Sequence, residues 1–300
     1  MNQRRFILRA IILGGVILVL AWTATSGTDV TYPEPEDATV ANGAFQSEYF
    51  GLRYSLPVDW VEDLKGPEPS TTGFYSLAAL KPAGELIATM QISAQDNFFA
   101  PGSTNNATDY LAGMKEHLDP SLSAGEAVGS IEFGGVPFAR LDYSGAGLEH
   151  SVFATEIRCH TVMFAITSRN KETVAKLTES LKKLSFSQAA QTGISTQESK
   201  PNAGWPLCIN ESDYRGYITH RVTPELVGPR FATVPVRLTI APDGKILHIH
   251  AIAGVSEQIK SITDALSRWE FKPYIVDGAP AEVETGILFQ FPQATGTPVK

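Results

Sequence analysis

The stretch from Val234 to Phe291 constrains the fold of this chain more than any other part of its sequence. Apolar residues alternate with polar ones over residues 234–240 and again over residues 245–252, which is the periodicity of strands that bury one face. The polar face of the first strand carries Pro235, Arg237 and Thr239. Between the strands, Ala241-Pro242-Asp243-Gly244 places proline at a turn corner and glycine where the backbone needs a positive φ, which predicts a tight hairpin.

A helix and a final strand are predicted after the hairpin. Four apolar residues recur at helical spacing: Ile259, Ile262, Leu266 and Trp269. Ser256 is placed to cap the helix, and Asp277-Gly278 turns the chain toward the last strand. One face of that strand carries Val283, Thr285, Ile287, Phe289 and Phe291, and the other carries Glu282, Glu284, Leu288 and Gln290. The pattern indicates a small sheet covered by one helix, without an obvious catalytic residue.

The whole chain suits one or two domains of the α+β class. It has 300 residues, of which 43% are hydrophobic, enough for ordinary cores. Its net charge of −8 and the lack of a basic stripe argue against a nucleic-acid partner. Residues 44–187 alternate between strand patterns, turns and two helical patterns, which predicts an antiparallel sheet of about six or seven strands. We therefore expect two small domains, each an antiparallel sheet packed with helices, behind an N-terminal membrane segment.

The N-terminus has the pattern of an export segment. Basic residues lead into an apolar run from Ala10 to Trp22, and its extension to Gly27 reaches the length of about 17–25 residues that spans a bilayer. The basic residues hold the leading segment in the cytoplasm. We expect a single-pass inner-membrane protein whose bulk lies in the periplasm. The alternative is a signal peptide cleaved near Ala24-Thr25-Ser26.

Two polar segments predict linkers between the parts of the chain. The first is acidic and contains Pro33 and Pro35, and the second, before Trp205, has many small polar residues and no hydrophobic periodicity. The expected order is a membrane segment at 1–27, a linker at 28–43, a domain at 44–187, a linker at 188–204, a domain at 205–292 and a tail at 293–300. Cys159 and Cys208 lie on either side of the domain boundary. In an oxidising compartment they either pair as a disulfide or remain separate as small buried hydrophobic residues.

One pair of histidines has a geometry that a metal site uses. His248 and His250 are two residues apart on a predicted strand, so their imidazoles share a face. No cysteine or carboxylate at a fixed offset completes a ligand set. The sequence therefore predicts no metal site, and we expect a solvent-facing or edge-strand pair.

No combination of residues supports catalysis. His160 follows Cys159, but adjacent strand residues point to opposite faces and do not form a thiol–imidazole pair. Glu282 and Glu284 share a strand face, an arrangement typical of a solvated edge that resists aggregation. No nucleophile elbow, phosphate-binding loop or zinc-protease motif is present. We expect no catalytic residue, no cofactor and no enzymatic activity.

The chain from about residue 215 to 292 resembles the TonB C-terminal domain. The resemblance rests on GYITHRVTPELVGPRFATVPVRLTIAPDGKI, from residue 216, and on ALSRWEFKPYIVDGAPAEVETGILFQF, from residue 265. Trp269, Phe271 and Pro273 are similar to the signature that closes the helix in that family. The resemblance implies a periplasmic, protein-binding energy transducer for outer-membrane receptor-dependent transport. Its implied partners are the N-terminal segments of outer-membrane receptors and the proton-driven motor proteins of the inner membrane.

The resemblance also implies where a partner binds. In that family the receptor segment adds to the sheet as an extra strand, so main-chain hydrogen bonds supply the affinity. Carried onto this chain, the docking edge is the final strand: Val283, Glu284, Thr285, Ile287, Phe289 and Phe291. The polar residues expected to flank the incoming strand are Glu282, Glu284 and Gln290. The strand is otherwise structural, or pairs with a second copy of the chain in a homodimer.

Three departures from the family favour a second hypothesis. The chain lacks a long proline-rich spacer, its membrane segment has no ionisable group between Ala10 and Gly27, and Ala232-Thr233 stands where the family has glycine. The alternative function is therefore a membrane-anchored envelope scaffold or ligand-binding protein without energy coupling.

Residues 44–187 resemble the PsbP-like fold. The resemblance rests on YFGLRYSLPVDW, from residue 49, and on MFAITSRNKETVAKLTESLKKLSF, from residue 163. That group works mainly by binding, so the resemblance implies no catalytic residues for this chain.

Overall fold

The computed structural model describes residues 32–292, apart from residues 65, 85, 101–105, 188–204 and 229–230. The membrane segment expected at residues 1–27 lies outside the described residues. None of the helices in the described part of the chain is long and apolar enough to cross a membrane. Pro33–Lys300 forms one compact unit. Within it we distinguish an N-terminal lobe, residues 33–187, and a C-terminal lobe, residues 205–292.

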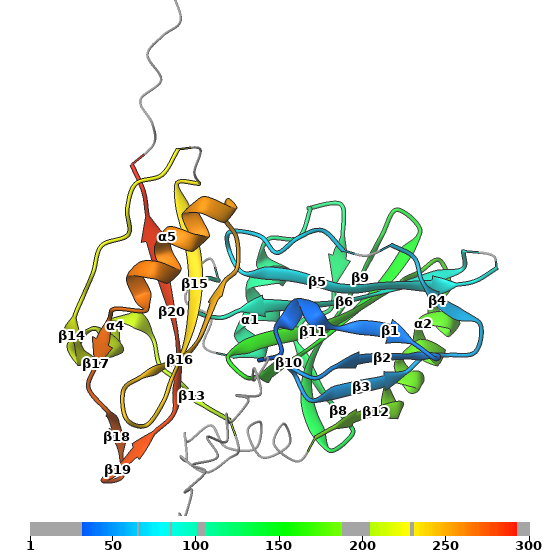
Figure 1. Cartoon of the computed structure of the whole chain (residues 1–300). Coiled ribbons are helices and arrows are strands. Elements are labelled where there is room, and N and C mark those ends of the chain that lie inside the picture. The colour runs from blue at the N-terminus through cyan, green and yellow to red at the C-terminus, as the bar shows by residue number, and fades with distance from the viewer. Residues whose placement is uncertain are drawn as a thin grey trace, which may run out of the picture. The chain divides into compact units, whose positions relative to one another are not determined.

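The N-terminal lobe contains two antiparallel sheets (Figure 1). The larger one has eight strands in the order β4-β5-β6-β11-β10-β9-β7, with β8 beside β9. Its strands are β4 (Trp60–Glu62), β5 (Phe74–Pro82), β6 (Ala88–Asp96), β7 (Ser123–Ala124), β8 (Gly129–Phe133), β9 (Val136–Gly145), β10 (Leu148–Ile157) and β11 (His160–Ser168). The smaller one has the order β1-β2-β3-β12, with β1 (Thr39–Ala41), β2 (Ala44–Ser47), β3 (Leu52–Ser55) and β12 (Leu184–Phe186).

The expectation of a single sheet of six or seven strands for this lobe is wrong. The strands of the second sheet have three or four residues each, and only β3 lies in a stretch whose alternating pattern stands out from the sequence. One of them, β1, lies in the segment expected to be a linker, as does the short 3-10 helix η1 (Pro35–Asp37). The lobe's remaining helices are α1 (Ala107–Glu116), α2 (Lys171–Ser180) and the 3-10 turn η2 (Leu181–Lys183).

The C-terminal lobe has the predicted succession of strand, hairpin, strand, helix and strand. Its main sheet has the order β13-β20-β15-β16, and α5 packs on it (Figure 1). Its strands are β13 (Leu207–Cys208), β15 (Thr233–Ile240), β16 (Ile246–Ala251) and β20 (Val283–Gln290), and the helix is α5 (Ser256–Leu266). Two strand pairs complete the lobe, β14 (Ile218–His220) with β17 (Glu270–Phe271) and β18 (Tyr274–Val276) with β19 (Ala279–Ala281), together with α4 (Glu211–Tyr214) and η3 (Arg215–Tyr217).

Helix caps and turns show how closely local sequence determines local structure. Gly244 has φ of +86°, and a Cβ there would collide with the carbonyl oxygen of Phe271, so the hairpin requires glycine. Asn170 accepts a hydrogen bond from the N–H of Glu172 at 2.8 Å, as expected for the cap of α2. At α5 the prediction is off by one residue, because Val255 is the N-cap and Ser256 begins the helix.

The strand β15 is buried on both faces, so the prediction of a half-buried strand is wrong for it. Its apolar face belongs to a core with α5 and β20, and includes Val234, Val236, Leu238 and Ile240. Its other face packs against the N-terminal lobe, where Arg237 is only 4% exposed. The lobes also share apolar packing, because Ile252 belongs to the main core of the N-terminal lobe. One face of the C-terminal sheet thus packs against the N-terminal lobe at the end of β6 and at the turn between β10 and β11.

Candidate functional site

The candidate docking site is the edge of β20 that faces away from β15. Glu282 and Glu284 direct their carbonyl oxygens to the β13 segment, where two N–H groups donate to them at 2.9 Å. Phe291 donates its N–H in the opposite direction, to the carbonyl oxygen of Ala232, at 2.8 Å. Because main-chain direction alternates along a strand, the even-numbered residues of β20 direct their polar groups away from β15.

Only the first part of this edge is covered by a strand. The parallel strand β13 pairs with β20 at Val283 and Glu284. Beyond them, Gly286, Leu288 and Gln290 have outward-directed main-chain groups, and no other strand among the described residues pairs with β20 on this side. Gln290 is exposed and Leu288 is 40% exposed, whereas Gly286 is buried and the short helix α4 lies beside β20. The edge therefore keeps a short segment able to accept another strand.

A pocket of about 490 Å³ borders this segment. Phe98 and Phe99 of the N-terminal lobe line one side, and Asn210 lines another at the start of α4. A Cβ on Gly286 would lie 2.5 Å from Phe98 Cβ and 2.7 Å from Phe99 Cζ, so glycine allows the lobe to approach the strand directly. A strand added next to Leu288 would therefore contact both lobes.

The side chains predicted for docking have different surroundings from those expected. Five of them form part of the lobe's core and are at most 8% exposed: Val283, Thr285, Ile287, Phe289 and Phe291. The expectation that Glu284 flanks an incoming strand is wrong, because it is 2% exposed and paired with two arginines. Glu282 remains partly exposed and Gln290 exposed. What the edge offers a partner is main-chain groups rather than the predicted side chains.

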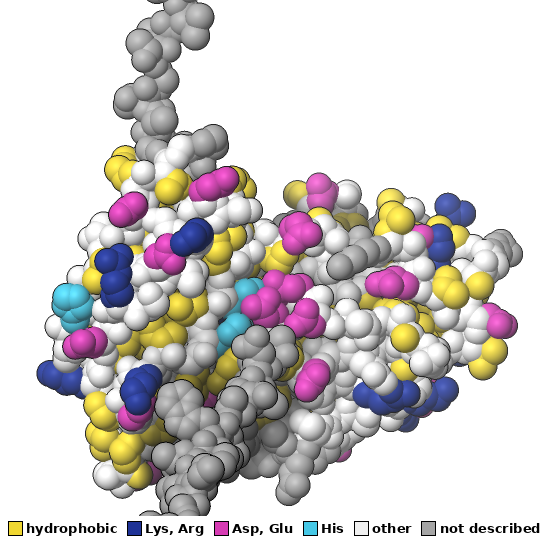
Figure 2. All heavy atoms as spheres, in the orientation of Figure 1, with side chains coloured by type: hydrophobic (Ala, Val, Ile, Leu, Met, Phe, Trp, Pro, Cys, Tyr) yellow, Lys and Arg dark blue, Asp and Glu magenta, His cyan; other side chains and the backbone are white. Residues whose placement is uncertain are grey.

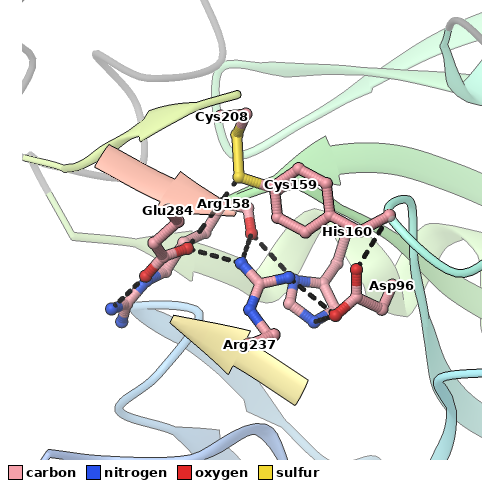
Figure 3. The surroundings of a disulfide bond; sticks show 8 residues. Asp96, Arg158, Cys159, His160, Cys208, Arg237 and Glu284 are labelled. Carbon is pink, nitrogen blue, oxygen red and sulfur yellow. Dashed lines mark hydrogen bonds and ion pairs between the residues drawn. A yellow bond between two sulfur atoms is a disulfide. The ribbon is translucent and has the colours of Figure 1, made fainter. Parts of the chain in front are cut away.

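A buried cluster of four charges joins the two lobes (Figure 3). Arg237 donates from Nη1 to Asp96 of β6 at 2.7 Å and from Nη2 to Glu284 at 2.5 Å. Arg158, in the turn between β10 and β11, donates to the other oxygen of Glu284 at 2.7 Å. The two positive and two negative charges balance, which is the condition for burying them.

The cluster also contains a neutral histidine. Burial, together with the charge of Arg237, lowers the pKa of His160 well below its usual value of 6.5. Its Nδ1 donates to the carbonyl oxygen of Arg158 at 2.8 Å, since that oxygen only accepts. Burial raises the pKa of Asp96, and Arg237 opposes the rise. Sequence reasoning missed the cluster because its members come from both lobes.

Cys159 and Cys208 form a disulfide between the lobes, with Cα atoms 5.7 Å apart (Figure 3). Arg158 and Cys159 both have left-handed backbones, with φ of +51° and +61°, in a two-residue hairpin turn. Such angles cost non-glycine residues free energy. The turn keeps them because Arg158 binds Glu284 and Cys159 forms the disulfide. The disulfide excludes a thiol nucleophile at Cys159 in this state.

Two of the three family-signature residues lie in the core of the C-terminal lobe. Trp269 and Phe271 are 6% and 7% exposed and belong to the core beneath β20. Trp269 donates from Nε1 to the carbonyl oxygen of Val222 at 2.7 Å, and Pro273 is exposed. The two aromatic residues therefore support the sheet without lining the free edge.

The comparisons with known proteins assign no function. No family model matches the chain, and no curated protein matches it. Among solved structures it is similar to the solution structure of cyanobacterial PsbP (CyanoP) from Synechocystis sp. PCC 6803, at 14% identity and a TM-score of 0.35. That similarity covers 49% of this chain and 95% of the other. A score this low supports no conclusion about fold or activity.

Proposed function

We propose that the chain binds an extended segment of a partner protein in the cell envelope by adding it as a strand to the edge of β20. The observation that supports this proposal is the end of that edge, where no described strand pairs with β20 and the exposed residues Leu288 and Gln290 direct main-chain groups outward. An exposed edge is a template for strand addition, and the bordering pocket provides room for alternate side chains of the added strand.

In its fuller form the proposal is a TonB-type energy transducer for outer-membrane transport. The partner is then the N-terminal segment of a receptor, and the segment before residue 28 engages proton-driven motor proteins of the inner membrane. In the sheet order β13-β20-β15-β16, β20 is the receiving strand beyond the two residues that β13 covers.

The second candidate is an envelope scaffold that binds peptides without transmitting force. The observation that favours it is the junction between the lobes, where the Cys159–Cys208 disulfide and the charges around Arg237 hold the docking strand against the N-terminal lobe. A body whose two lobes are cross-linked in this way suits a fixed platform.

The proposal is tested with biotinylated peptides from the N-terminal segments of outer-membrane receptors of the same organism. Leu288→Pro removes an outward-directed N–H at an exposed position, and Leu288→Ala keeps that N–H as the matched control. We expect the full-length protein and the alanine variant to bind a peptide, and the folded proline variant to bind it at least tenfold more weakly. Equal binding by both variants, or no binding by the unmodified protein, would refute strand addition here.

A second measurement separates the transducer from the scaffold. Membranes that carry the full-length protein are cross-linked and probed for the proton-driven motor proteins. Recovery of motor proteins together with peptide binding supports the transducer. Peptide binding without them supports the scaffold.

A further inference from the structure

Two glutamates near the start of the described chain lie against two histidines near its end. Glu34 and Glu36 flank Pro35 at the beginning of η1, and His248 and His250 project from one face of the edge strand β16. Figure 2 shows histidine side chains beside a group of acidic ones near the centre of one face. Sequence reasoning discarded the histidine pair for want of carboxylate ligands, and the fold supplies two from the segment expected to be a linker.

Glu34, Glu36 and His250 offer ligand atoms that all lie within 4.8 Å of one another, and His248 lies against Glu34, so it has to turn toward the other two to complete the ligand set. His248 Nε2 lies 3.3 Å from Glu34 Oε1, and His250 Nε2 lies 3.5 Å from the other oxygen of Glu34. In a tetrahedral zinc site with bonds of about 2.0–2.2 Å, neighbouring ligand atoms are about 3.3–3.6 Å apart. His250 Nε2 is 2.8 Å from Glu36 Oε1, a hydrogen bond that has to open by about 0.5 Å to admit the ion.

Burial and charge distinguish this group from an ordinary surface cluster. His250 is only 6% exposed, and ligand atoms of Glu34, Glu36 and His250 all lie within 4.8 Å of one another. Glu36 Oε2 is buried, and no described group donates a hydrogen bond to it. A buried carboxylate oxygen without a donor is costly unless a cation neutralises it. Among ion pairs of the described residues, both carboxylates pair only with these imidazoles.

A pocket lined by acidic residues leads to this group. A pocket of about 380 Å³ opens beside Glu36, and Asp37, Glu62 and Glu68 also line it. Negative charge around a recess raises the local concentration of cations. The four ligand groups are two imidazoles and two carboxylates, a donor set that suits Zn²⁺ and is too rich in nitrogen for Ca²⁺ or Mg²⁺.

We propose that Glu34, Glu36, His248 and His250 form a structural Zn²⁺ site that fastens the segment at η1 to the edge strand β16. This role is independent of strand addition at β20, which lies on the opposite side of the sheet. A bound ion neutralises the two carboxylates and holds η1 against one face of β16. All four protein ligands are then used, as in a closed structural site rather than a catalytic one.

The test is Zn²⁺ titration of the purified full-length protein after removal of metals with a chelator. We expect one ion per chain with a dissociation constant below about 1 µM, and X-ray absorption showing only nitrogen and oxygen ligands at about 2.0–2.1 Å. Glu36→Gln and His250→Gln should each weaken binding at least 100-fold. His220→Gln, on an exposed histidine outside the cluster, is the matched control and should leave the affinity unchanged.

Unfolding curves of the metal-free variants verify that they fold. The proposal is overturned if the unmodified protein binds no Zn²⁺, if it takes up Ca²⁺ in preference to Zn²⁺, or if folded His250→Gln keeps full affinity. Glu36→Gln and His250→Gln should lose Zn²⁺ but still bind the receptor peptide as the unmodified protein does, because β16 and β20 lie on opposite sides of β15 in the sheet.

Discussion

Removing the disulfide between the lobes should destabilise the folded chain by about 4 kcal/mol. The two cysteines are separated by 49 residues, and in the chain-entropy account a loop of that size lowers the entropy of the unfolded state by about 14 cal/mol/K. Cys208→Ser is the perturbation of choice because Cys208 is exposed, so serine there leaves no buried cavity. The decrease in the free energy of unfolding therefore measures the contribution of the cross-link itself.

The assay is urea unfolding followed by both circular dichroism and tryptophan fluorescence. The two signals should coincide if the lobes unfold together, as their shared packing around Ile252 predicts. The unmodified protein under reducing conditions provides a second route to the open cross-link and should show the same loss. A loss below about 1 kcal/mol by both routes would refute the entropy argument. A loss in the serine variant alone would trace the effect to the substitution.

Three further predictions follow from the junction. Arg237→Met should cost about 3–5 kcal/mol in urea unfolding because it leaves Asp96 buried without an arginine and Glu284 with Arg158 alone, and adding Asp96→Asn should recover part of that cost. Below pH 6.5, the usual pKa of histidine, His160 is protonated in the unfolded chain but stays neutral in the folded one. Each pH unit of acidification should therefore lower the free energy of unfolding of the unmodified protein by about 1.4 kcal/mol more than that of His160→Gln, as measured by unfolding at several pH values. Cys208→Ser frees β13 from its tether beside β20, which lengthens the edge open to a partner, so the receptor peptide should bind more tightly than to the unmodified protein in calorimetric titration.

Much of the C-terminal lobe could be predicted from sequence because its signals are local. The hairpin needs glycine at residue 244, the apolar faces of β15 and β20 follow the period of a strand, and α5 follows the period of a helix. In the N-terminal lobe the long strands were predicted in the same way. In its second sheet β1 and β2 were not predicted because they have too few residues to show an alternating pattern, and β12 was not predicted because it pairs with the distant strand β3.

The candidate sites depended on tertiary structure to a greater degree. Alternation along a strand indicates which side chains share a face, but it cannot say whether a polar face meets water or another lobe. Arg237 and Glu284 were predicted on polar faces and lie in a buried charge cluster, because the N-terminal lobe covers them. The free edge of β20 likewise depends on where β13 stops.

The sequence alone determined β15, the hairpin, β16, α5 and β20, but not the short strands β17, β18 and β19, because the periods and turn residues that specify the longer elements act within a few positions. Only the tertiary structure decided which of those residues form sites. Glu36 and His250 are 214 residues apart in the chain, and their side chains are 2.8 Å apart in space. Whether Cys159 and Cys208 form a disulfide or stay separate was left open by the sequence and decided by the fold. Such contacts arise from the packing of one lobe on the other, which no local pattern encodes.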